Sequence, residues 1–72
     1  MTEAERTELK EAVFKMMNDT EPRKRPWRIR SLEANIRFRK AFNGIDIEAA
    51  NVILEALNEY AITQQGGANG NV

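Results

Sequence analysis

The chain contains neither cysteine nor histidine, and this absence constrains its fold more than any motif does. A domain of 72 residues buries a smaller fraction of its surface than a large one, so its core alone gives little stability. Small domains often gain further stability from disulfides, from bound zinc or from oligomerisation. Cysteine is needed for the first, and zinc is rarely held without cysteine or histidine, so we expect one small core and a homodimer.

The same absence argues against an enzyme. Histidine is the usual general base near neutral pH, and Ser31 is the only serine available as a nucleophile. Glu48, Glu55 and Glu59 are predicted to lie on the solvated face of one helix, where no pocket would tune them for acid–base catalysis. The sequence therefore predicts a non-enzymatic protein with no catalytic residue, no metal site and no cofactor.

A first helix is predicted near residues 2–18. Thr2 and Glu5 have the spacing of a capping box, in which each side chain bonds the backbone amide of the other residue. Apolar residues then recur at steps of three and four, which is typical of a helix with one buried face. The residues of this predicted stripe are Leu9, Ala12, Val13, Met16 and Met17.

A last helix is predicted near residues 46–62, with Asp46 as its N-cap and Glu48 beside the positive end of the helix dipole. One broad apolar face should supply much of the core, and it consists of Ile47, Ala50, Ile53, Leu54, Leu57, Tyr60 and Ala61. Residues 65–72 contain little to bury, so we expect a disordered tail after a single domain at 1–64.

A middle helix is predicted near residues 31–43, ending where Gly44 takes a left-handed conformation and Ile45 supplies the apolar contact that often follows. This helix would be apolar on two opposite sides, which suits a central position or a dimer interface. Its two apolar sides are formed by Ala34, Phe38, Ala41 and Phe42 on one side and Leu32 and Ile36 on the other.

A hairpin is the alternative for this middle segment. Residues 27–30 and 36–39 both alternate apolar and basic side chains, as half-buried strands do. The connection between them lacks glycine and holds good helix formers, so it favours the helix. Pro22 and Pro26 bracket a basic tripeptide, and we expect residues 19–30 to form an extended arm. The predicted fold is all-α, three helices with a basic arm; the alternative is α-β-β-α.

The formal net charge is zero, but the charges lie in three blocks. Residues 1–22 carry six acidic and three basic side chains, and residues 41–72 carry four acidic side chains and no basic one. Residues 23–40 carry eight basic side chains and one acidic one. A block this basic attracts nucleic acid, an acidic protein, or the acidic helices of the chain itself or of a second subunit.

The basic block supplies the candidate binding residues. Arginine bonds phosphate and carboxylate groups with two parallel donors, and an exposed indole can stack on a nucleic acid base. The candidate contacts for nucleic acid or another polyanion are Arg23, Lys24, Arg25, Trp27, Arg28, Arg30, Arg37, Arg39 and Lys40. We expect contact with the phosphate backbone rather than base-specific readout, because the acidic last helix would be repelled from a major groove.

Two functional hypotheses follow from these residues. The first is a nucleic-acid-associated regulatory protein that contacts phosphates through the basic block. The second is a protein-interaction module, such as an inhibitor or assembly factor, that uses the basic arm, Trp27 and apolar surface on the middle helix. Trp27 itself is expected to pack over the helices as a core anchor, because one tryptophan in so small a core usually does.

The sequence gives no sign of membrane association. No apolar run approaches the roughly 20 residues that a membrane-spanning helix needs. The segment from Met1 to Lys10 is charged and lacks the apolar centre of a signal peptide. We therefore expect a cytoplasmic protein.

Overall fold

The computed structural model describes the backbone of residues 1–69 and the side chains of residues 1–64. Three α-helices form the fold: α1 (Glu3–Asp19), α2 (Arg25–Ala41) and α3 (Ile47–Asn69), with a short 3-10 turn η1 (Pro22–Lys24) before α2. No strand occurs between residues 1 and 69. The all-α prediction is confirmed, and the alternative with a central hairpin is wrong.

Helix α1 begins as its sequence predicts. The Thr2 side chain accepts a hydrogen bond from the Glu5 amide at 3.1 Å, and Glu5 accepts one from the Thr2 amide at 2.8 Å. These two bonds satisfy amides that have no partner inside the helix. Helix α1 ends at Asp19, where Thr20 adopts an extended conformation before Pro22.

The extended arm predicted for residues 19–30 is wrong for its second half. Only a short connection separates α1 from η1 and α2, and α2 already begins at Arg25. Pro26 lies in the first turn of α2, where a missing amide costs nothing because that amide would have no partner inside the helix. The prolines therefore mark the start of α2, which places Trp27, Arg28 and Arg30 on a helix.

Helix α2 ends in a Schellman motif, but the sequence analysis predicts its left-handed residue one position too late. Asn43, not Gly44, takes the left-handed conformation, with φ of 56°. The Gly44 amide bonds the Arg39 carbonyl at 2.7 Å, and the Asn43 amide bonds the Lys40 carbonyl at 3.3 Å. Asparagine tolerates this conformation better than most residues do, which explains why it can replace glycine here.

Helix α3 begins where Asp46 was predicted to cap it. The Asp46 side chain accepts a hydrogen bond from the Ala49 amide at 3.0 Å. The helix then continues to Asn69, past the predicted end at 62, so residues 65–69 are helical rather than part of a tail. The remaining part of the predicted tail, residues 70–72, lies outside the described residues.

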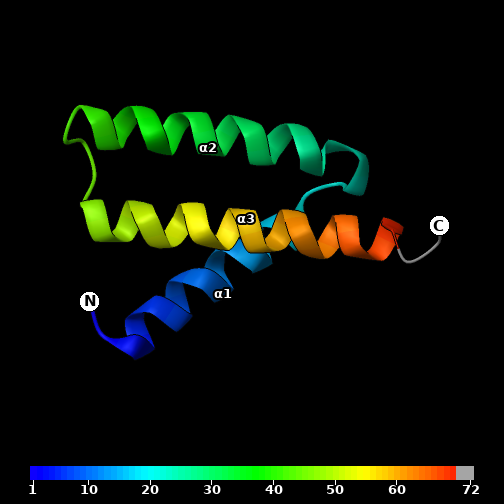
Figure 1. Cartoon of the computed structure of the whole chain (residues 1–72), viewed down its shortest axis with the longest axis horizontal. Helices are drawn as coiled ribbons and strands as arrows, with labels where there is room; N and C mark the ends of the chain where they lie inside the picture. The colour runs from blue at the N-terminus through cyan, green and yellow to red at the C-terminus, as the bar shows by residue number, and fades with distance from the viewer. Residues whose placement is uncertain (70–72) are drawn as a thin grey trace.

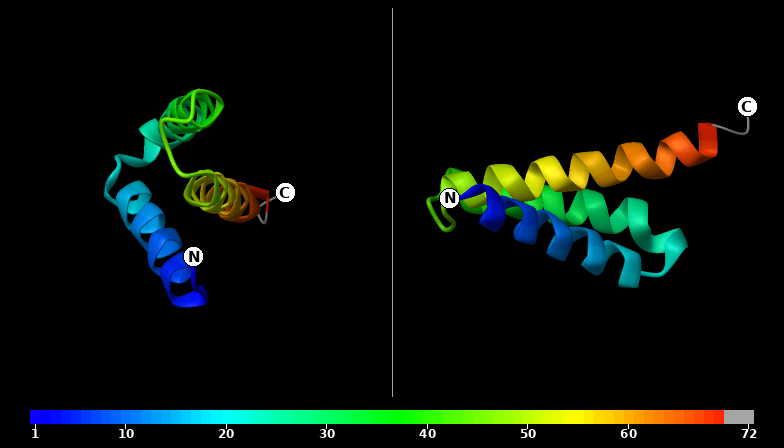
Figure 2. Two further views of the ribbon diagram at one scale, coloured as in Figure 1. Left: turned by 90° about the vertical axis from the view of Figure 1, so that its left-hand side faces the viewer. Right: turned by 90° about the horizontal axis from the view of Figure 1, so that it is seen from below.

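Helix α3 lies between the other two helices. Helices α2 and α3 run antiparallel and side by side, while α1 crosses α3 at an angle (Figure 1). Viewed along α3, α1 and α2 lie on different sides of it and contact each other little (Figure 2). Each outer helix therefore packs mainly against α3, while the end of α1 and the start of α2 also meet in the core and through the Arg25 side chain.

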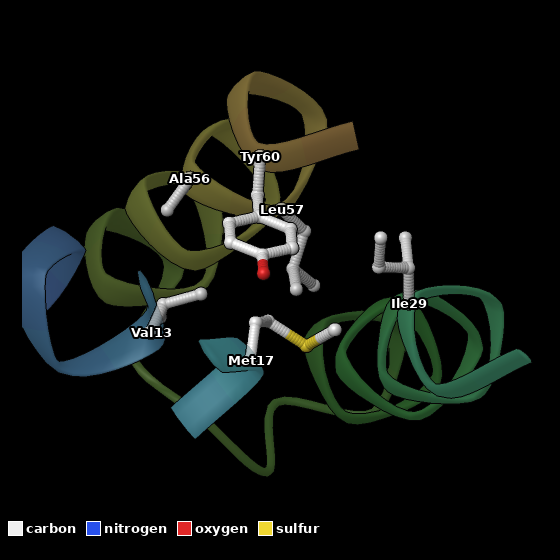
Figure 3. Close-up of a cluster of buried hydrophobic side chains, with 6 residues drawn as sticks. All are labelled: Val13, Met17, Ile29, Ala56, Leu57 and Tyr60. Carbon is white, nitrogen blue, oxygen red and sulfur yellow. The ribbon is translucent and has the colours of Figure 1, made fainter. Parts of the chain in front are cut away.

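The core lies where the three helices approach one another (Figure 3). Its buried cluster contains Val13, Met17, Ile29, Ala56, Leu57 and Tyr60. The Tyr60 hydroxyl donates a hydrogen bond to the Asn18 side chain at 2.8 Å, so the buried tyrosine keeps a polar partner. Burial of each large side chain here contributes about 2 kcal/mol to stability.

Most of the predicted core positions are covered, with three corrections. Ala12 was expected on the buried stripe of α1 but is exposed. Met17 and Leu57 are fully buried, and Met16 packs against the cluster, as expected for core fillers. Ile47 was predicted to be in the core but is 54% exposed at the start of α3. Trp27 was expected to anchor the core but is 62% exposed, because it lies on the side of α2 that faces away from α3.

Candidate binding surface

Helix α2 presents two apolar faces, and only one of them is covered. Ile29 and Ile36 are buried and Leu32 is half-buried. The opposite side of the helix is exposed along its whole length, and we call it the outer stripe. It consists of Trp27, Ser31, Ala34, Phe38, Ala41 and Phe42, spaced at intervals of three and four residues so that they share one side. The predicted two-sided apolar character is confirmed.

Three of the six large apolar side chains exposed in the described part of the chain lie on this outer stripe. Trp27, Phe38 and Phe42 are 62%, 65% and 72% exposed. The rings of Phe38 and Phe42 lie one helical turn apart, with centroids 4.8 Å from each other and planes inclined by 40°. They therefore form one continuous apolar surface at the carboxyl end of α2.

Basic side chains flank the outer stripe on both sides. At 100° per residue, Arg30 and Arg37 follow one edge, while Arg28 and Arg39 follow the other with Asn35 between them. Arg30, Arg37 and Arg39 are exposed, and Arg28 is half-buried. In total α2 carries six basic side chains and one acidic one. The structure thus brings most of the predicted basic residues onto one helix around an aromatic stripe.

Arg25 belongs to the predicted set but has a structural role. Its Nε–H is shared between the Met17 and Thr20 carbonyls at 3.1 and 3.0 Å, and its Nη2 donates to the Asn18 carbonyl at 3.0 Å. The Met17 and Asn18 carbonyls belong to the last turn of α1, and Thr20 directly follows it. The Met17 carbonyl also accepts a hydrogen bond from the Thr20 amide at 3.1 Å. Arg25 therefore joins the end of α1 to the start of α2 through its Nε and Nη2 atoms. Its predicted contact with a phosphate group stays a prediction.

Four other predicted residues make only local contacts. Arg23 and Lys24 both pair with Glu21, at 2.7 and 3.6 Å, and their side chains stay 80% and 63% exposed. On α2 the contacts are equally short in sequence: Arg37 pairs with Glu33 at 3.6 Å, and Arg39 donates to Asn35 at 2.8 Å. Exposed pairs of this kind contribute little and are easily replaced by an external partner.

Lys40 and Arg28 differ from the rest. Lys40 reaches α3 and donates to the Asn51 side chain at 2.7 Å. Arg28 lines an open hollow between the end of α1 and the start of α2, where both basic and acidic side chains gather: Lys15, Asp19, Glu21 and Lys24. Its Nε is buried and makes no hydrogen bond to the described residues. Neither side chain forms an ion pair with an acidic residue of the described chain.

The acidic face of α3 is neutralised from α1 instead. Lys10 pairs with Glu55 at 3.1 Å and with Glu59 at 2.8 Å, and Arg6 lies 3.5 Å from Glu55. The N-terminal ammonium group pairs with Glu48 at 2.6 Å. The three glutamates predicted to be simply solvated thus have partners from a different block of the sequence, and the basic residues of α2 are not used for them.

These pairs shift the ionisation of their members. The hydrogen bond from Lys10 lowers the pKa of Glu55 below its ordinary value of 4.5, and the nearby positive charges act in the same direction. The hydrogen bonds to Glu59 and Glu55 raise the pKa of Lys10 above 10.5. In each case the charged form is the one that the pair favours.

We expect the stabilising effect of this cluster to be lost in acid. Glu55 has a lowered pKa, so its contribution is present above about pH 4.5 and is lost as the pH falls through the folded-state pKa. Lys10 stays charged throughout this range, since its pKa is raised. In urea denaturation between about pH 6 and pH 3, the wild type should lose more unfolding free energy than Lys10→Gln.

Lys15→Gln is the matched control for this experiment. Lys15 is exposed on the same helix and forms no ion pair in the described part of the chain. Its pH profile should follow that of the wild type. Identical profiles for the wild type and Lys10→Gln would show that the cluster contributes nothing to the pH dependence.

Two other kinds of functional feature, a metal-binding cluster and a membrane-spanning helix, are not found within residues 1–69. No group of three or more acidic side chains gathers there in a way that would hold a metal ion. No helix of this part combines the length and apolar character required to cross a membrane.

The fold and the surface define a small all-α protein of three helices, one of which carries an exposed aromatic stripe between arginines. In comparisons with known proteins, no family model, no curated protein and no solved structure matched the chain.

Proposed function

We propose that this protein is a non-enzymatic interaction module that binds an acidic partner protein through the outer side of α2. The observation that carries the proposal is the coincidence of two features on one helix. The outer stripe exposes three aromatic side chains, and arginines follow both of its edges. Exposed apolar patches bordered by charge are typical of protein-binding surfaces.

The ion pairs of the molecule support an external acidic partner. If the basic block served to neutralise the chain itself, its side chains would pair with the acids of α1 and α3. Within the described residues they pair only with Glu21 and Glu33, close to them in sequence. The acids of α3 pair with α1 and the N-terminus. The positive charge of α2 is therefore left for another molecule.

Nucleic acid is the second candidate partner. Trp27 is exposed beside Arg28 and Arg30, and Arg23 and Lys24 lie just before it. An aromatic ring among basic side chains can stack on a base while the charges contact phosphates. Such binding would weaken steeply with salt, by about 0.9 log units per log unit of salt for each phosphate neutralised on a duplex.

Site-directed photo-crosslinking in cells that produce the full chain tests the proposal. A photoreactive phenylalanine analogue replaces Phe38, and in the control it replaces Glu11, which is exposed on α1. We expect crosslinks to protein from position 38 that disappear when Arg30→Glu and Arg37→Glu are added. Crosslinks to nucleic acid would favour the second candidate. Equal crosslinking from both positions, or none from position 38, would contradict binding through α2.

A further inference from the structure

The outer stripe has the dimensions of a helix-binding surface. Phe42 lies fifteen residues after Trp27, so at about 1.5 Å per residue the outer stripe is about 22 Å long. Between the large side chains of Trp27 and Phe38 lie the small residues Ser31 and Ala34. Large residues alternating with small ones give the ridges and grooves into which the side chains of a second helix pack.

The arginines decide which kind of helix fits. A helix that packs along the outer stripe brings its own flanking residues next to Arg30 and Arg37 on one side and Arg28 and Arg39 on the other. Basic flanks would be repelled and neutral flanks would leave the charges without partners. Acidic flanks would form ion pairs along both edges, and arginine binds carboxylates with two donors.

A second copy of this chain does not meet that requirement. Two outer stripes facing each other, parallel or antiparallel, would place arginines beside arginines on both edges. The remaining large apolar side chains exposed in the described part of the chain, Met1, Ile47 and Ile62, form no comparable stripe. The homodimer expected from the small size of the chain stays a prediction, and this surface is unsuited to it.

We propose that the outer stripe binds an acidic amphipathic α-helix of another protein. This inference rests on the proposed function and specifies the partner: apolar residues at intervals of three and four over about four turns, with glutamate or aspartate on both edges of the apolar row. The apolar row covers Trp27, Phe38 and Phe42, while the carboxylates pair with the flanking arginines.

The geometry of the aromatic rings favours a helix over nucleic acid. Phe38 and Phe42 pack against each other at 4.8 Å and form one joint apolar surface rather than separate platforms for stacked bases. Phosphates contacting the arginines would leave this apolar surface in water. A helix with an apolar row covers the aromatic and the basic residues together.

Trp27 makes the inference directly measurable, because it is the only tryptophan of the chain. The probe is a tryptophan-free synthetic helix of about 18 residues, with leucine at intervals of three and four and glutamate on both edges of the leucine row. We expect a saturable blue shift of the emission of the full-length protein as exposed Trp27 becomes covered. Peptides of the same composition with scrambled order should give no shift.

Variants separate this surface from general charge attraction. Phe38→Ser with Phe42→Ser should weaken binding by about tenfold or more, since both rings lie in the contact. Ile62→Ser, which removes an exposed apolar side chain from α3, should leave the affinity unchanged. Arg30→Glu with Arg37→Glu should also weaken binding by about tenfold or more. Circular dichroism of each variant is the control that it keeps its helical structure.

Three results would overturn the inference. The first is equal binding of the patterned and scrambled peptides, and the second is equal affinity of the Phe38→Ser, Phe42→Ser variant and the wild type. The third is binding of a single-stranded oligonucleotide at physiological salt that is tighter than that of the patterned peptide. If the peptide fails while position 38 still crosslinks to protein in an arginine-dependent way, the acidic helix is wrong and the proposed function stands. If both fail, both are wrong.

Discussion

Replacement of Leu57 by alanine is expected to lower the free energy of unfolding by about 3 kcal/mol. Leu57 is fully buried in the cluster that joins all three helices, where it lies with Met17 and Ile29 (Figure 3). Truncation removes apolar contacts and leaves a cavity that rigid helices fill only partly. A domain of this size has a total stability of about 4 to 11 kcal/mol, so the loss is a large fraction of the whole.

Urea denaturation followed by circular dichroism measures this effect. The control is Ile62→Ala, because Ile62 is on the same helix but 57% exposed, and its replacement should change stability by less than about 0.5 kcal/mol. A loss below about 1 kcal/mol for Leu57→Ala would mean that the three helices do not share the core described here.

Replacement of Arg25 by alanine is expected to cost about 2 kcal/mol. The guanidinium group bonds three backbone carbonyls at the end of α1, at 3.0 to 3.1 Å. Hydrogen bonds from a charged donor are stronger than neutral ones. Their loss removes the side-chain partner of the Asn18 and Thr20 carbonyls, while the Met17 carbonyl keeps the Thr20 amide. The connection between α1 and α2 should therefore loosen, and amide hydrogen exchange in residues 16–24 should accelerate.

Two further variants test the role of Arg25. Arg23→Ala removes the same charge from an 80% exposed position, so it should cost less than about 0.5 kcal/mol. Arg25→Lys keeps the charge but loses the fork of donors, so it should restore only part of the stability. Equal stability of Arg23→Ala and Arg25→Ala would show that the contacts with α1 contribute nothing.

Local signals in the sequence predict the caps of α1 and α3 correctly. The Thr2–Glu5 capping box and the Asp46 cap each act over three residues, and both form as predicted. The start of α2 is missed because a proline in the first turn of a helix resembles, in sequence, a proline that prevents one. The contacts of Arg25 with the end of α1 are missed because its carbonyl partners lie five to eight residues earlier, in the last turn of α1 and at Thr20 just after it.

The candidate surface could be predicted in its parts but not in its arrangement. The basic block, Trp27 and the two apolar sides of the middle helix are visible in the printed sequence. Lys10 pairs with Glu55 and Glu59, which lie 45 and 49 positions further along the chain. A local sequence pattern cannot predict contacts over such a separation. That pairing is what leaves the charges of α2 without acidic partners on the other helices.

The sequence by itself determines that this protein is helical, that its positive charge is concentrated in the middle of the chain, and that α2 is apolar on two sides. These properties depend on residue spacing along one helix. Only the tertiary structure decides which side of α2 is buried. Ile29 packs in the cluster with residues of α1 and α3, and Ile36 is buried on the same side of α2. Helix α1 lies on another side of α3 (Figure 2), and Trp27, Phe38 and Phe42 on the opposite side of α2 stay exposed.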